Sequence, residues 1–265
     1  MRKEVEDTYV GKDGLLYCKT CHTKRERVLP CSILGGELRV PVKCRCQQEK
    51  YDNEEAERKA WEFAEEVKRN RKICFTEKQM WNWRFENADS DDPIMENARI
   101  YVDNWKDVRK EGTGLILWGG VGSGKTYMAA CIANGLLDEG HKVLMRNFND
   151  ISNISIFDQR EYLDSLSKYD LLILDDLGVE RKTEFATSNV FNVVDRWCAS
   201  GKPLIVTTNL SLKELKEPIR LEDERIFDRV LKVCVPMKVD RESRRKEIAD
   251  KRLGFIRSIF GRENG

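Results

Sequence analysis

The feature that most constrains the fold of this chain is the octapeptide Gly-Gly-Val-Gly-Ser-Gly-Lys-Thr at residues 119–126. It directly follows a short apolar run at residues 115–118, of the kind found in buried parallel strands. The glycines allow backbone N–H groups to turn inward onto phosphate oxygens, and the helix that follows presents its positive end to the same anion. The sequence therefore predicts a strand, a phosphate-binding loop and a helix, in that order, within an α/β fold.

Two side chains of this loop carry specific expected roles. Lys125 is expected to reach the β- and γ-phosphates of ATP, and Thr126 offers a hydroxyl group to Mg²⁺. The following helix is expected to continue to Gly140, which supplies a left-handed stop. The full set of residues predicted to bind the nucleotide and its Mg²⁺ is Gly119, Gly120, Val121, Gly122, Ser123, Gly124, Lys125, Thr126 and Asp175.

Another strand is predicted at residues 170–176, where the apolar run 171–174 ends in the carboxylate pair Asp175 and Asp176. The carboxyl end of a buried parallel strand emerges beside the phosphate-binding loop, where Asp175 can hold Mg²⁺ through its waters. Asp176 is then expected to polarise the attacking water. The alternative is that the pair only caps the turn that follows.

Further strands and helices alternate around these motifs. Strands are predicted at residues 142–146 and 204–206, and between them Thr183 is expected to cap a helix that ends at Gly201. Asn209 follows the last of these strands and is expected to sense the γ-phosphate and align water, although strand-end amides often satisfy loop backbone instead. The alternation predicts a parallel sheet between two helical layers, an αβα sandwich.

Five of the nine cysteines lie between positions 18 and 46. They include two short pairs, Cys18 with Cys21 and Cys44 with Cys46, which suit the tetrahedral coordination of Zn²⁺. A reducing compartment disfavours disulfides, so metal is the preferred explanation of the cluster. Cys31 and His22 remain possible substitutes for one ligand, and the alternative is a set of unliganded thiols.

The next segment is almost uninterrupted helix former, and an amphipathic connecting helix is predicted from Asp52 to Lys72. Asp52 and Glu55 are expected to form its capping box, with an apolar face at residues 56, 60, 63, 64 and 67. The aromatic stretch after it, with Trp81, Trp83 and Phe85, is expected to pack against the following domain. Stacking on nucleic acid is the alternative.

Composition removes several classes of function. The 265 residues carry 47 basic and 46 acidic side chains, so the whole chain has no field that would attract nucleic acid. Residues 1–50 and 241–265 are each +4, and either end could contact phosphate. No apolar run approaches the ~18 residues needed to cross a bilayer, and the charged start does not look like a signal peptide. A cytoplasmic protein without a membrane partner is therefore expected.

With GGVGSGKT, LLILDDLG and IVTTN in this order, residues from about 75 to 250 resemble the AAA+ ATPases of the DnaC/DnaI helicase-loader group. The segment Asp175–Phe185 is similar to that group in particular, with a second Asp where other AAA+ proteins have Glu. The cysteine pairs resemble the zinc module of several such loaders. The resemblance implies a P-loop AAA+ fold, ATP hydrolysis that is slow and stimulated by partners, and a sensor-1 residue at Asn209.

The same resemblance assigns roles to three arginines. The finger that reaches a neighbour's nucleotide falls on Arg229, with Arg225 as the second choice, and a sensor-2-like arginine falls on Arg245. Arg244 stands where the group often has Tyr. Without the resemblance, the simplest expectation for these arginines is salt bridging on a helix surface.

These inferences combine into one prediction. Residues 1–50 form a zinc-binding module that contacts a helicase, residues 51–74 a charged linker helix, and residues 75–265 an AAA+ ATPase domain. The chain is predicted to use ATP, Mg²⁺ and Zn²⁺, to assemble with itself on ATP binding, and to load a DnaB-type replicative DNA helicase onto single-stranded DNA.

Three other functions remain open at this point. An IstB-type transposition-helper ATPase shares the ATPase core but usually lacks the zinc module. A DnaA-like initiator would append a duplex-DNA-binding domain, and only 20 of the 265 residues follow Arg245. A helicase adaptor or inhibitor could bind ATP without useful turnover.

Overall fold

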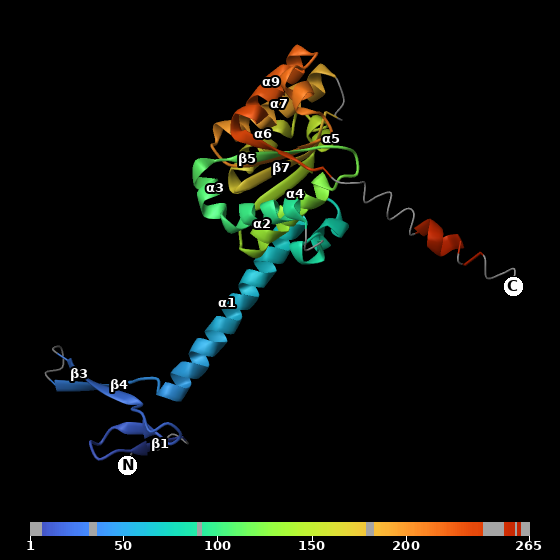
Figure 1. Cartoon of the computed structure of the whole chain (residues 1–265). Helices are drawn as coiled ribbons and strands as arrows, with labels where there is room; N and C mark the ends of the chain where they lie inside the picture. The colour runs from blue at the N-terminus through green and yellow to red at the C-terminus, as the bar shows by residue number, and fades with distance from the viewer. Residues whose placement is uncertain are drawn as a thin grey trace. The chain divides into compact units, whose positions relative to one another are not determined.

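A computed structural model of the chain describes residues 7–31, 36–88, 92–178, 183–240, 252–257 and 259–260. The chain divides into two compact units, Met1–Glu65 and Glu66–Gly265 (Figure 1). The boundary falls inside the segment 51–74, for which the sequence predicts a linker helix. Among the described residues, no helix is long and apolar enough to span a membrane.

The first unit contains two small antiparallel pairs of strands. Strand β1 (Thr8–Val10) pairs with β2 (Leu16–Cys18), and β3 (Glu26–Cys31) pairs with β4 (Gly36–Pro41). Two-stranded pairs of this size are marginally stable by themselves. The buried residues among the described strands and turns are few: Thr8, Leu15, Cys18 and Cys44. Apolar burial therefore supplies little of the stability of this unit.

Helix α1 runs from Arg45 to Cys74 and contains the boundary between the units. It begins seven residues before Asp52, so the predicted capping box is wrong. Asp52 lies inside the helix, where its carboxylate accepts a hydrogen bond from Gln48 Nε2 at 2.7 Å. Local sequence permits both starts because the residues before Asp52 are also good helix formers.

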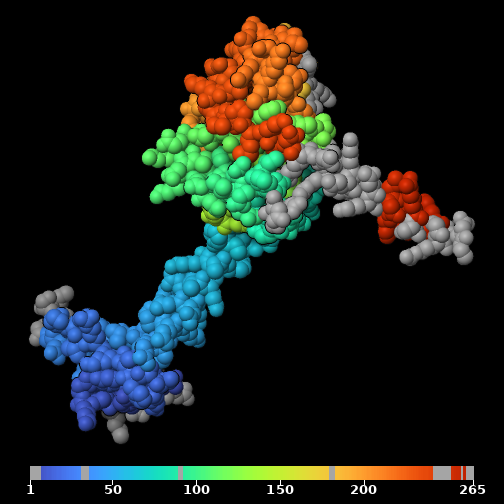
Figure 2. All heavy atoms as spheres, viewed as in Figure 1, coloured from blue at the N-terminus to red at the C-terminus, as the bar shows by residue number. Residues whose placement is uncertain are grey.

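The predicted amphipathic face of α1 is also wrong. Of its five positions only Val67 is buried, while Ala56, Ala60, Phe63 and Ala64 are exposed. In Figure 2 the visible face of the middle of α1 is not covered by other atoms of the chain. Ion pairs one turn apart support the exposed helix instead of packing, between Arg58 and Glu62, Glu55 and Lys59, Lys50 and Glu54, and Arg45 and Glu49.

The second unit is built on a five-stranded sheet in which every strand is parallel to its neighbours. Its order is β6-β7-β8-β5-β9. The strands span β5 (Gly114–Trp118), β6 (Val143–Asn147), β7 (Leu171–Leu177), β8 (Leu204–Thr208) and β9 (Cys234–Lys238). The predicted strands are therefore confirmed, with shifts of one or two residues at their ends. Because the strands are parallel, their carboxyl ends meet at one edge of the sheet.

Helices cover both faces of this sheet (Figure 1). They are α2 (Pro93–Asp103), α3 (Trp105–Glu111), α4 (Lys125–Asp138), α5 (Phe148–Ser152), α6 (Gln159–Ser165), α7 (Glu184–Ala199), α8 (Leu212–Lys216) and α9 (Leu221–Val233), with short 3₁₀ turns at Lys78–Asn82, Phe85–Asn87 and Leu166–Lys168. Alternate strand residues point to opposite faces. Leu115 and Leu117 pack in a core with α2 and α4, whereas Ile116 packs in a second core with α5, α7 and α9. The predicted αβα sandwich is confirmed.

The local signals that end and begin helices are also confirmed. Gly140 follows α4 with a φ angle of 87°, and Gly201 follows α7 with a φ angle of 69°. The Thr183 hydroxyl accepts the N–H of Ala186 at 3.2 Å and caps α7. The aromatic side chains of Trp81, Trp83 and Phe85 pack partly buried against the core that contains α2 and α4. The prediction that these aromatic residues pack against the following domain is therefore confirmed.

Candidate functional site

The phosphate-binding loop lies between β5 and α4, at the carboxyl edge of the sheet. Gly119 has a φ angle of 150°, and a Cβ atom there would lie 2.3 Å from the carbonyl oxygen of Val239. Only glycine fits this position, because the backbone after β9 packs directly against the loop. Gly124 starts α4 in the left-handed region with a φ angle of 96°. The loop thus has the conformation that its glycines predict.

Lys125 is buried at the start of α4, and its ammonium group faces back into the loop. Lys125 Nζ donates to the carbonyl oxygens of Gly119 at 2.9 Å and Gly120 at 2.7 Å. It also donates to Asn209 Oδ1 at 2.8 Å. The structure therefore brings the predicted phosphate-binding lysine and the predicted sensor-1 amide into direct contact across 84 residues of sequence.

Asp175 lies near the end of β7, beside the first residues of α4. Its Oδ1 accepts hydrogen bonds from Thr126 Oγ1 at 3.0 Å and from Thr207 Oγ1 at 2.5 Å. Burial raises the pKa of this carboxyl above its usual range, and the negative charge of Asp176 adds to the effect. A hydroxyl and a carboxylate oxygen are hard oxygen ligands, so the donor set at Thr126 and Asp175 fits Mg²⁺.

Asp176 occupies an unusual backbone position. Its φ angle is 63°, and the pairing of β7 with β8 shifts register between Leu174 and Leu177. Such a bulge re-aims side chains near functional sites, and Asp is one of the few residues that tolerate the left-handed region. The N–H of Asp176 donates to Thr207 Oγ1 at 3.0 Å. The hydroxyl of Thr207 therefore fixes the backbone of Asp176 at this bulge.

Thr207 is a site residue that the sequence analysis missed. It is fully buried in β8, and its single hydroxyl connects the side chain of Asp175 with the backbone of Asp176. A hydroxyl residue in an otherwise apolar buried strand, next to a predicted sensor, is the signal that could have identified it.

Arg229 and Arg225 lie on α9 and line a cavity of about 410 Å³ together with Phe191. Arg229 Nε pairs with Asp195 Oδ1 at 2.8 Å, and its Nη1 pairs with Asp228 at 3.2 Å. The guanidinium of Arg225 lies 4.5 Å from the ring centroid of Phe191. Among the described residues that line this cavity, none belongs to the phosphate-binding loop. Arg244, Arg245 and the segment 179–182 lie outside the described residues.

The four predicted zinc ligands come together in the first unit. The Sγ atoms of Cys18, Cys21, Cys44 and Cys46 all lie within 4.8 Å of one another. Cys46 Sγ is 3.6 Å from Cys18 Sγ and 3.3 Å from Cys44 Sγ. Tetrahedral Zn–S bonds of about 2.3 Å place neighbouring sulfur atoms about 3.8 Å apart. The cluster could therefore hold Zn²⁺, and its donor set fits that ion.

The electrostatics of the cluster favour a cation. A hydrogen bond from the Thr23 hydroxyl lowers the pKa of Cys21 to about 5. The neighbouring Cys44 sulfur raises the pKa of Cys46 to about 12, and Cys21 and Cys18 add to the effect, because four thiolates cannot crowd together unneutralised. Of the two substitutes left open, His22 contacts the hydroxyl of Tyr9 at 3.3 Å, and Cys31 ends β3.

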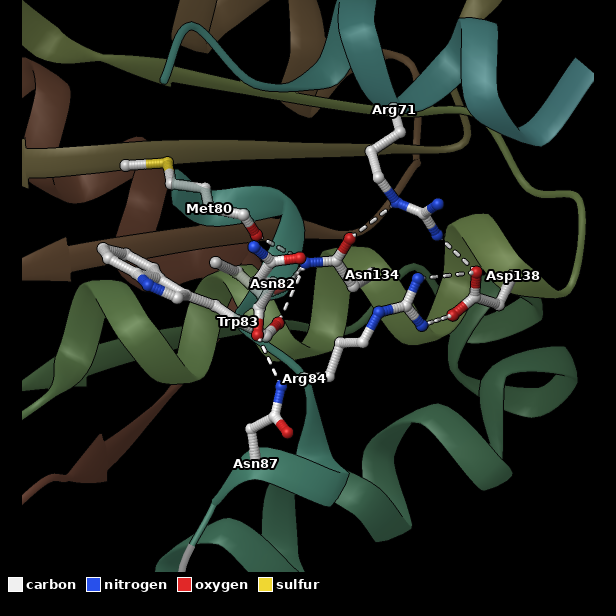
Figure 3. Close-up of polar contacts among 9 residues, drawn as sticks. Arg71, Met80, Asn82, Trp83, Arg84, Asn87, Asn134 and Asp138 are labelled. Carbon is white, nitrogen blue, oxygen red and sulfur yellow. Dashed lines mark hydrogen bonds and ion pairs between the residues drawn. The ribbon is translucent and has the colours of Figure 1, made fainter. Parts of the chain in front are cut away.

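A polar cluster around the buried Asn134 joins the end of α1 to the phosphate-binding helix α4 (Figure 3). Asn134 of α4 donates to the carbonyl oxygens of Met80 and Trp83 at 2.8 and 2.9 Å, and accepts from Arg71 Nε at 2.9 Å. Asp138, one turn further, pairs with both Arg71 and Arg84. Nothing in the sequence singles out Asn134, because its partners lie about fifty residues earlier.

The sequence of this chain is similar to a known family and to several curated proteins. Residues 50–252 match the family described as IstB-like ATP binding protein. The replicative helicase loader DnaC of Escherichia coli strain K12 is 30% identical over 143 residues, covering 51% of this chain and 56% of DnaC. The replicative helicase loader DnaI of Bacillus subtilis strain 168 is 28% identical over 193 residues, covering 66% of this chain and 62% of DnaI. The chain thus spans little more than half the length of these curated relatives.

The fold comparison agrees with the sequence comparison. A crystal structure of DnaI superposes with a TM-score of 0.55 and 22% identity, over 66% of this chain and 99% of that structure. At this identity the likeness shows the fold alone, a parallel sheet between two helical layers.

Proposed function

The chain belongs to the family of IstB-like ATP-binding proteins, and we propose that it is an ATP-dependent loader that delivers a DnaB-type replicative DNA helicase onto single-stranded DNA. The observation that carries the proposal is the meeting of Lys125, Asn209 and Asp175 at one sheet edge, in a chain whose relatives include proteins named helicase loaders. The cysteine cluster of the first unit adds the module expected to contact the helicase.

The ATP site would act through competition for Lys125. In the structure its ammonium group binds two loop carbonyls and Asn209. A γ-phosphate is the stronger partner for an ammonium group, because the hydrogen bond is then assisted by charge on both sides. Lys125 would move to the phosphate and release Asn209, whose amide could then report whether the γ-phosphate is present.

Hydrolysis would be carried by the carboxylates of β7. Thr126 and Asp175 would hold Mg²⁺, while Asp176 would orient the attacking water. Asp176 is one methylene shorter than the Glu of other AAA+ proteins. Slow turnover, stimulated by partners, is therefore expected of this site.

Arg229 would act on the ATP of a neighbouring copy. On its own chain it is paired with Asp195 and Asp228, in a cavity lined by no described residue of the phosphate-binding loop. ATP bound at such a boundary would hold copies together around single-stranded DNA. Hydrolysis would remove the γ-phosphate contacts that favour this assembly, so that helicase and DNA are released.

A loading assay with purified components tests the proposal. A ring-shaped helicase cannot thread onto a covalently closed single-stranded DNA circle, so helicase recovered on the circle measures loading. With ATP, the wild-type chain should load the helicase. Lys125→Ala should fail to load the helicase because it binds nucleotide weakly. Asp176→Asn should bind ATP but not hydrolyse it. Lys110→Ala, a change of an exposed lysine on α3, is the matched control. Loading that is equal with and without ATP contradicts the proposal.

The family match favours a second candidate function, that of a transposition helper. An IstB-type ATPase would assist a transposase, and the match to that family covers residues 50–252. The cysteine cluster lies outside the matched segment and has no assigned purpose in such a helper. Nucleotide-dependent binding of this chain to a transposase, with no binding to the replicative helicase, would favour the second candidate.

A further inference from the structure

The C-terminal residues carry an apolar helical face. Residues 252–257 and 259–260 are helical, and their apolar side chains are exposed, including 64% of Phe260. At about 100° per residue, Leu253, Phe255 and Ile256 fall within an arc of about 160° on one side of the helical run 252–257, and Ile259 and Phe260 add two more exposed apolar side chains. The segment 252–260 contains Arg252 and Arg257 and no acidic residue, so its charge is +2. An exposed apolar face of this kind indicates a docking surface.

A groove between α8 and α9 has the complementary chemistry. Its volume is about 310 Å³, and its apolar lining is Leu210, Pro218, Ile219 and Phe227. Among the described residues that line it, the carboxylates of Glu214, Glu217 and Asp223 face the guanidinium of Arg220, which gives this lining a net charge of −2. Ile219 at its edge is fully exposed. The groove and the C-terminal helix therefore match in both apolar character and charge.

The exit of the chain from the sheet indicates which copy supplies the helix. β9 ends at Lys238, and the N–H of Val239 donates to the carbonyl oxygen of Trp118 at 2.8 Å, directly before the phosphate-binding loop. The C-terminal segment therefore begins beside the ATP site. Eleven residues separate position 240 from Arg252, and an extended connection of that length spans up to about 36 Å.

Helix α9 contributes both to the groove and to the proposed boundary between copies. It lines the acidic groove through Asp223 and Phe227, and it also carries Arg229, the proposed trans-acting finger. Where Arg229 of one copy reaches the ATP of another, α9 of the first copy lies next to the point where the second copy's C-terminal segment begins. We infer that the C-terminal helix of one copy docks in the α8–α9 groove of its neighbour. The inference rests on the ATP-bridged assembly of the proposed function.

Photo-cross-linking on the full chain tests this docking. A benzophenone side chain in place of Phe260 is irradiated with ATP in an equal mixture of isotopically heavy and light chains. We expect cross-links to residues 217–223, about half of them joining a heavy chain to a light one. The same side chain in place of Trp61, an exposed residue of α1, is the positional control and should not mark this segment. Cross-links that never join heavy to light would mean docking within one chain and would overturn the inference.

Charge reversal gives an independent readout. Arg257→Glu and Asp223→Arg should each weaken ATP-dependent self-association by about tenfold in Kd, and the double variant should recover most of it. Lys110→Glu, the same change of charge on α3, should have no effect. Sedimentation with and without ATP measures the association.

The outcomes separate this inference from the proposed function. If ATP drives assembly but Arg257→Glu leaves it unchanged and cross-links fall elsewhere, only the docking inference is overturned. If the wild-type chain does not assemble with ATP, both are overturned.

Discussion

The two units of this chain differ in what holds them together. In the second unit, strand residues alternate between two apolar cores, and each core is closed by helices. The described residues of the first unit form two small strand pairs with few buried side chains, and two of the buried residues, Cys18 and Cys44, belong to the cysteine cluster. Apolar burial stabilises one unit, and we expect metal coordination to stabilise the other. We therefore expect that each unit can be unfolded while the other stays folded.

The largest expected effect is on the first unit. Replacing Cys18 and Cys44 together by Ser should reduce bound zinc from one ion per chain to none. Because structural zinc supplies about 10–16 kcal/mol of binding free energy, the module should unfold. ATP affinity should be unchanged, since the second unit has its own core. Metal analysis, hydrogen exchange of residues 7–31 and ATP titration measure the three effects.

Cys198→Ser is the matched control for this double variant, because Cys198 lies on α7 outside the cluster. It should keep full zinc occupancy. Full zinc occupancy in the double variant would show that the four cysteines are not the ligands. Loss of ATP binding would show that the units are not independent.

The second unit is expected to act across a boundary between copies, with Arg229 of one copy contacting the ATP of the next. Arg229→Ala should bind ATP normally and hydrolyse it about a thousandfold more slowly, as expected for loss of an arginine finger. Lys125→Ala should bind nucleotide weakly. Mixing the two inactive variants should restore some hydrolysis, because one retains a finger and the other an intact ATP site. Steady-state phosphate release at several mixing ratios measures it.

Arg196→Ala is the control, since Arg196 is an exposed arginine of α7 paired with Asp164. Its hydrolysis should equal that of the wild type. If the mixtures stay as inactive as the separate variants while both still assemble, Arg229 is not a trans-acting finger. Arg225, on the same helix, then becomes the candidate.

A third, smaller effect should be confined to the second unit. Asn134→Ala removes the donor to the carbonyl oxygens of Met80 and Trp83 and the acceptor for Arg71. We expect the free energy of unfolding of this unit to fall by about 2–4 kcal/mol, with zinc content unchanged. The exposed Asn104, whose amide donates only to Ile100 one turn away, gives the control Asn104→Ala with an effect below about 0.5 kcal/mol. Equal effects of the two changes, measured by denaturant unfolding, would refute the role of this cluster.

The smallest expected effect is a gain of stability at the ATP site. Burial raises the folded-state pKa of Asp175, so its protonated form favours the folded state. That stability is fully present below about pH 4 and is lost as the pH rises through the raised pKa. At pH 7 without nucleotide or Mg²⁺, Asp175→Asn should therefore raise Tm, by roughly 2–4 °C if the gain is about 1 kcal/mol.

The pH dependence provides the check on this last prediction. The difference in Tm between Asp175→Asn and the wild type should shrink as the pH falls toward 4, because the wild-type carboxyl then becomes protonated. A variant that is less stable than the wild type at pH 7 would contradict it. The same variant should lose Mg²⁺-dependent hydrolysis, which is the cost of the added stability.

The units also differ in how far their sequences predict them. The strands β5 to β8, the loop from Gly119 to Thr126 and the cap at Thr183 follow from local rules, because each depends on a few neighbouring residues. The four cysteines were predictable as a group because each pair, Cys18 with Cys21 and Cys44 with Cys46, has the close spacing typical of metal ligands. The start of α1 at Arg45 was missed because the residues on both sides of Asp52 are helix formers, so local propensity does not choose between the two starts.

The parts of the site that sequence could not predict depend on contacts between distant segments. Asn134 becomes a central residue only when the turn at Met80 packs against α4. Thr207 joins Asp175 to Asp176 only once β7 and β8 are paired with a register shift. The pairing of Arg229 with Asp195 likewise needs α7 and α9 side by side. Tertiary packing decides all three.

The most direct test of the central claim is affinity capture of the helicase with different nucleotides. The full chain is immobilised and incubated with cell extract in ATP or in ADP, and the retained proteins are identified by mass spectrometry. We predict that a replicative helicase is retained with ATP and released with ADP, and that Lys125→Ala abolishes the difference. Equal retention of the helicase with both nucleotides, or no helicase with either, would contradict the account.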